Sequence, residues 1–176
     1  MRRAPALFTS ILIWLEETPL SVWVREYPSL LGFPFILFLH TLGLAMLAGV
    51  SVAIDVWLLR ERAIAQTVRL TGFIRVMWLG LGINAVSGVA LLMAYPAKAL
   101  TNAVFYVKIV LVVLGVYAIQ RINRELFPGG YAAAGVVVTP AAKRWAAASL
   151  FAWVATVFTG RLLAYTHQVL FGSELL

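Results

Sequence analysis

The 176-residue sequence contains no cysteine and carries little charge. Charged residues make up 12% of the chain and hydrophobic residues 62%. The absence of cysteine excludes disulfides, thiolate metal sites and a cysteine nucleophile. The scarcity of charge excludes an ordinary soluble globular domain. Phosphate-binding glycine loops, zinc signatures and a serine–histidine–acid set are also missing, so we expect no catalytic activity of the ordinary kind.

Long apolar segments occupy most of the chain, and its mean hydropathy is +0.94. A helix of about 20 apolar residues crosses a bilayer. Four segments meet this length, at residues 30–59, 71–94, 104–122 and 145–170. The sequence therefore predicts an all-α integral membrane four-helix bundle over residues 30–176, surrounded by the lipid bilayer.

Residues 1–29 are apolar but interrupted by acidic residues and a proline. Thr18 and Pro19 form the pattern of a helix N-cap followed by a first-turn proline. Trp14 and Trp23 are suited to the depth of the lipid headgroups. We therefore expect an N-terminal interfacial amphipathic segment of one or two short helices.

The net charge of +7 is distributed unevenly along the chain. Most basic residues flank two of the connections, with Arg60, Arg62, Arg69 and Arg75 around the first, and Arg121, Arg124, Lys143 and Arg144 around the third. Positive charge in short loops marks the cytoplasmic side. The pattern predicts a multi-pass protein of the bacterial inner membrane with both termini in the periplasm, and it does not indicate a nucleic-acid partner.

The two histidines of the chain, His40 and His167, both fall in apolar segments. A histidine inside a membrane is costly unless it is paired, ligated or turned toward a protein interior. Helical spacing places small or polar residues on the same face as each histidine, a pattern typical of closely packed helices. The three stripes are His40, Gly43 and Leu47; Gly80, Asn84, Ser87 and Gly88; and Ser149, Thr156, Gly160 and His167.

Two inward histidines indicate a possible haem b. Imidazole is a good axial ligand for haem iron, and neighbouring glycines give a flat porphyrin room. In this interpretation His40 and His167 ligate the iron, and Lys108 and Arg161 neutralise the propionates.

Other interpretations of these residues stay open. Each histidine fits equally well as a packed, hydrogen-bonded residue. Copper is a third option, with the soft donors Met46, Met77 and Met93. Arg161 is also suited to extending outward, or to binding a lipid phosphate or a quinone oxygen.

Asp55 lies deep in the first span, where an unpaired carboxylate is expensive. A structural ion pair with Arg60 or Arg75 is the simplest prediction. The functional alternative is a proton or cation relay.

Three segments of the chain resemble a bacterial membrane family catalogued as DUF6644: ETPLSVWVREYPSLLGFPFILFLHTLGLAMLAGVSVAIDVWLLR, GVALLMAYPAKALTNAVFYVKIVLV and SLFAWVATVFTGRLLAYT. The positions that carry the resemblance are His40, Asp55, Arg60, Lys108, Gly160 and Arg161. The family is similar in outline to four-helix membrane proteins such as the CopD group and the b-type cytochromes. It has no assigned chemistry to transfer, and His167 lies beyond the matching pattern.

These observations lead to three functional hypotheses. The first is a membrane-embedded electron-transfer module that holds haem b and exchanges electrons with quinone or a periplasmic partner. The second is a non-catalytic accessory subunit of a larger membrane complex. The third is a copper or small-solute permease.

Overall fold

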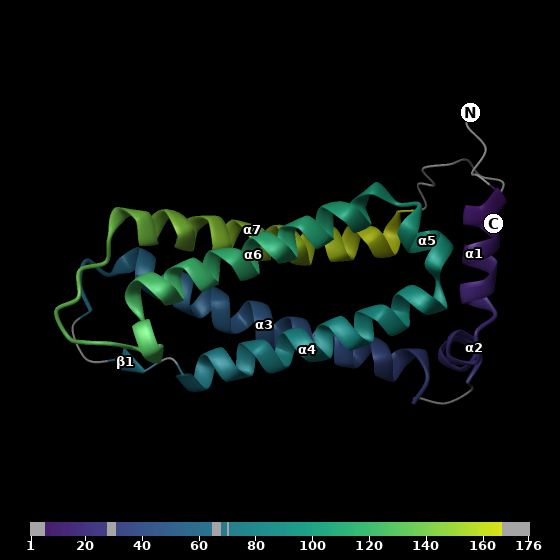
Figure 1. The fold of residues 1–176 in the computed structure, drawn as a ribbon, viewed down its shortest axis with the longest axis horizontal. Coiled ribbons are helices and arrows are strands. Elements are labelled where there is room, and N and C mark those ends of the chain that lie inside the picture. The colour runs from purple at the N-terminus through teal and green to yellow at the C-terminus, as the bar shows by residue number, and fades with distance from the viewer. Residues whose placement is uncertain (1–5, 28–30, 65–67, 70, 167–176) are drawn as a thin grey trace.

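Four long helices form a bundle in the computed structural model, which describes residues 6–27, 31–64, 68–69 and 71–166 (Figure 1). All four are long and apolar enough to cross a membrane, which confirms the all-α four-helix prediction. They are α3 (Phe33–Arg60), α4 (Thr71–Ala94), α6 (Ala103–Leu126) and α7 (Pro140–Tyr165). Helix α3 packs against α4 and α7, and α6 packs against α7.

The helices differ from the sequence prediction in their ends and in their number. Helix α6 continues to Leu126, four residues beyond the predicted end. Helix α7 begins at Pro140 instead of Trp145, because the Thr139 hydroxyl accepts a hydrogen bond from Ala142 N at 3.0 Å and caps the helix. A short helix, α5 (Pro96–Leu100), follows α4 directly and was not predicted. Its proline occupies the first turn, where a missing N–H costs nothing.

The N-terminal helices α1 (Ala6–Glu16) and α2 (Pro19–Glu26) lie across one end of the bundle, beside α5 (Figure 1). We call this the α5 end. The predicted cap is present, since Ser21 N donates to the Thr18 hydroxyl at 3.4 Å. Ser21 Oγ donates to Met93 O at 2.8 Å and ties α2 to the end of α4. Trp14 and Trp23 are exposed there, as an interfacial segment requires.

The opposite end, which we call the ribbon end, joins the two basic connections (Figure 1). Strand β1 (Val68–Arg69) pairs antiparallel with β2 (Tyr131–Ala132), which follows the 3-10 turn η1 (Pro128–Gly130). An isolated bridge between Ala63 and Val137 extends the contact. The connections rich in arginine and lysine therefore lie together at one end, as the charge pattern requires.

Glycine allows the two tightest helix contacts. A Cβ on Gly43 would lie 2.6 Å from Asn84 N, and one on Gly80 would lie 2.7 Å from Met46 Cβ, so the backbones of α3 and α4 touch. A Cβ on Gly115 of α6 would lie 2.7 Å from the buried Trp153 ring of α7. Small residues are what permits such an approach between membrane helices.

Replacing Gly43 with alanine tests the α3–α4 contact. We expect Gly43→Ala to destabilise the protein by about 1–3 kcal/mol, because the new methyl group forces the two backbones apart. The matched control is Gly49→Ala in the same helix, where an added Cβ has nothing within 4 Å. Thermal unfolding in detergent micelles measures both variants, and equal stabilities would contradict the prediction.

Candidate functional site

His40 joins three helices near the α5 end of the bundle. Its Nδ1 lies 3.0 Å from the backbone oxygen of Asn84 and 3.2 Å from Ser87 Oγ, both on α4. Its Nε2 lies 3.2 Å from Lys108 Nζ on α6. Both ring nitrogens are therefore engaged, one by each neighbouring helix.

The partners of the ring define where its protons lie. A carbonyl oxygen only accepts, so Nδ1 carries the hydrogen and donates it to Asn84. The Nε2–Nζ contact needs one N–H between the two nitrogens. Either Lys108, as an ammonium or as a neutral amine, donates to the Nε2 lone pair, or an Nε2–H group donates to a neutral lysine amine. In each case one hydrogen lies between His40 Nε2 and Lys108 Nζ.

Helix α4 contacts both the backbone and the ring of His40. Asn84 Nδ2 donates to His40 O at 2.7 Å, which makes the contact between the two residues reciprocal. A Cβ on Gly88 would lie 3.1 Å from His40 Cε1, so the ring packs directly on this glycine. The imidazole is thereby fixed on α4, with Nε2 turned toward α6.

Lys108 approaches His40 from a less constrained position. Its side chain is half-buried, and a Cβ on Gly160 of α7 would lie 4.0 Å from Lys108 Cε. The lysine stem therefore lies next to α7 at Gly160.

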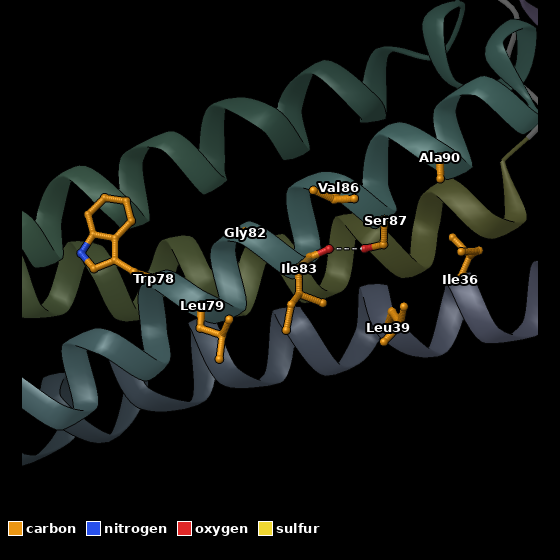
Figure 2. A pocket seen from close by; sticks show the side chains of 9 residues that line it. All are labelled: Ile36, Leu39, Trp78, Leu79, Gly82, Ile83, Val86, Ser87 and Ala90. Carbon is orange, nitrogen blue, oxygen red and sulfur yellow. Dashed lines mark hydrogen bonds between the residues drawn. The ribbon is translucent and has the colours of Figure 1, made fainter. Parts of the chain in front are cut away.

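An apolar groove of about 510 Å³ runs along the outer side of α3 and α4 next to this cluster (Figure 2). Ser87 is the hydroxyl-bearing residue in its wall, and its Oγ donates to Ile83 O at 2.6 Å. The lining residues are Ile36, Leu39, Trp78, Leu79, Gly82, Ile83, Val86, Ser87 and Ala90. Ser87 thus separates the His40 ring from an apolar surface.

The structure brings together some of the predicted site residues and not others. Lys108 contacts His40 itself instead of standing apart as a propionate partner. Arg161 is exposed on α7 and takes no part in the cluster. His167 lies outside the described residues.

The predicted space for a porphyrin is absent on the α4 side of His40. Gly43 is covered by the backbone of α4, and Gly88 is covered by the His40 ring. These glycines admit a neighbouring helix or ring, not a ligand. The described residues therefore leave no slot for a porphyrin between α3 and α4 beside His40. Because His167 lies outside them, the bis-histidine haem stays a prediction.

The described residues also give little support to copper. They contain no group of three or more histidine, cysteine or acidic side chains placed to hold a metal ion. Met77 is a core residue, and its sulfur lies 3.6 Å from Ser51 Oγ.

The predicted ion pair of Asp55 is wrong. Asp55 is fully buried, whereas Arg60 and Arg75 are exposed, and the one ion pair in the described part of the chain joins Arg25 and Glu26. The reason is rotation about the helix. Five residues turn an α-helix by about 140° beyond a full turn, so Arg60 faces away from the interior that Asp55 enters.

No family model, curated protein or solved structure matches this chain. The resemblance to the bacterial membrane family therefore stays a prediction, and the candidate site is interpreted from its own geometry.

Nitrogen-15 NMR of histidine-labelled protein tests the assigned tautomer, because the chain contains two histidines only. We expect His40 to show a protonated Nδ1 and an Nε2 signal that shifts in Lys108→Met, while its Nδ1 signal stays in place. A His167→Gln variant assigns the spectrum. A His40 ring protonated at Nε2 alone would contradict the hydrogen-bond assignment.

Proposed function

We propose that this protein moves protons in the membrane, with the His40–Lys108 pair as its proton-binding site. The observation that carries the proposal is the 3.2 Å contact between Nε2 and Nζ, made while Nδ1 is held by Asn84 O. Two nitrogen bases at this separation exchange a proton directly, without an intervening water.

The fixed Nδ1–H determines the direction of exchange. A proton cannot leave the ring through Nδ1 unless the hydrogen bond to Asn84 breaks. Protons therefore enter and leave His40 at Nε2, through Lys108. The half-buried lysine has a flexible four-carbon stem, which lets its amine move between the imidazole and the bundle surface.

The membrane setting supports a functional role for the pair. Ionisable residues inside membrane helices are expensive, so they are rare and usually mark ion or proton pathways. We further propose that the ribbon end faces the cytoplasm, since it gathers the basic connections. The His40–Lys108 pair, in the half of the bundle nearer α5, then exchanges protons with the periplasmic side.

Electron transfer through haem b is the second candidate. One observation favours it, because a histidine that donates Nδ1–H to a backbone carbonyl presents Nε2 as a metal-ligating lone pair. The glycine contacts and the Lys108 amine at Nε2 oppose it. If haem binds, its chemistry is electron transfer, and His40 is the residue of the described chain that would hold it.

Proton flux into liposomes containing the purified protein tests the first proposal. We expect His40→Gln and Lys108→Met to lower the protein-dependent flux by about a hundredfold, the scale of a lost proton-transfer group. Arg161→Gln is the control, because this exposed arginine lies outside the cluster. Folded variants of His40 and Lys108 with unchanged flux would remove the pair as the proton-binding site.

A reduced-minus-oxidised absorption spectrum separates the two candidates. We expect the purified protein to show no haem b bands. A b-type spectrum that disappears in His40→Ala would establish the second candidate in place of the first. A spectrum that survives this substitution would remove His40 as an iron ligand.

A further inference from the structure

A second polar cluster lies between α3 and α7, farther along the bundle from the α5 end. Asp55 on α3 and Ser149 on α7 are both fully buried. Helix α7 packs against α3. Both carboxyl oxygens of Asp55 and the hydroxyl oxygen of Ser149 are buried without a hydrogen-bond partner within the described residues.

The charged side chains on the surrounding helices do not neutralise the charge that an ionised Asp55 would carry. From α7, Lys143 donates its ammonium to Leu59 O at 3.2 Å. Arg60 at the end of α3 and Arg75 on α4 are exposed. On the inner side of α3, Ser51 donates to Leu47 O at 2.9 Å and is already engaged. An ionised carboxylate in this position would be a buried charge without a counter-ion, which is strongly unfavourable.

A proton on the Asp55 carboxyl group removes the uncompensated charge and also supplies a hydrogen-bond donor. A neutral carboxyl group has no charge to desolvate, and its O–H group can donate a hydrogen bond to Ser149 Oγ. The serine hydroxyl can in turn donate to the second carboxyl oxygen.

Along α7, Trp153 lies between this cluster and the level of Lys108. Trp153 is fully buried and packs on Gly115 of α6. On α7 it lies one turn beyond Ser149 and before Gly160, the residue beside Lys108. At 1.5 Å per residue, Ser149 and Gly160 are about 16 Å apart along the helix, and His40 and Asp55 about 22 Å apart along α3.

We propose that Asp55 and Ser149 form a second proton-binding site, on the ribbon side of Trp153. The proposal extends the proposed function, because it gives the bundle one proton-binding site on each side of a buried indole. Protons that cross the bundle then bind first at one site and later at the other.

Infrared spectroscopy of the 176-residue protein tests the second site without measuring transport. At about pH 6 the exposed carboxyl groups are ionised. We expect the wild type still to show the carbonyl band of a protonated carboxyl group, and Asp55→Asn to lack it. A wild type without this band, or a band that persists in Asp55→Asn, would overturn the proposal. A band abolished by sodium chloride would overturn it in favour of a cation site.

One serine variant and one threonine variant test the site without changing Asp55. We expect Ser149→Ala to shift the carboxyl band, because the bonded hydroxyl is lost. Thr156→Val is the matched control on the same helix, since this buried hydroxyl donates to Ala152 O at 2.7 Å. An unshifted band in Ser149→Ala would exclude Ser149 from the site. If the carboxyl band is present but the liposomes show no proton flux, the Asp55–Ser149 site stands and the proposed function is rejected.

Discussion

The contact between the backbones of α3 and α4 at Gly43 and Gly80 is the constraint on which the His40 cluster depends. Only at this separation does the Asn84 amide reach His40 O while the His40 ring reaches Asn84 O. Polar groups inside a membrane have no water to satisfy them, so they must satisfy one another. Gly43 and Gly80, which have no side chain to form hydrogen bonds, thereby determine the positions of His40 and Asn84.

The contacts of His40 with α4 differ in kind from its contact with α6. On the α4 side, the ring has a fixed donor, a packed glycine and a reciprocal amide bond. On the α6 side, its partner is a long side chain beside Gly160. The proposed proton exchange therefore depends on the flexible side chain of Lys108, opposite an imidazole that is held in place by α4.

Hydropathy and helical period predicted the bundle, its spans and the inward faces of Asn84, Ser149 and Thr156. They did not predict that Lys108 meets His40, because that contact depends on how α6 is placed relative to α3, which neither helix encodes alone. The Asp55 ion pair failed for a related reason. Nearness along the chain suggested Arg60, but helix rotation sends the two side chains to different faces. Helical period thus predicted the inward faces of Asn84, Ser149 and Thr156, but not which side chains meet.

The separation of the two proposed proton sites limits how they influence each other. Unit charges about 20 Å apart interact by about 0.8 kcal/mol at an effective dielectric constant of about 20. This is less than the 1.4 kcal/mol that changes an equilibrium tenfold, so electrostatics alone leaves the sites nearly independent. Along α7, the buried indole of Trp153 lies between Ser149 and Gly160 and packs on Gly115 of α6. Direct proton transfer needs hydrogen-bond contact, which a separation of about 20 Å does not allow. Transfer between the two proposed sites therefore requires intervening water or other proton-carrying groups at the level of the indole.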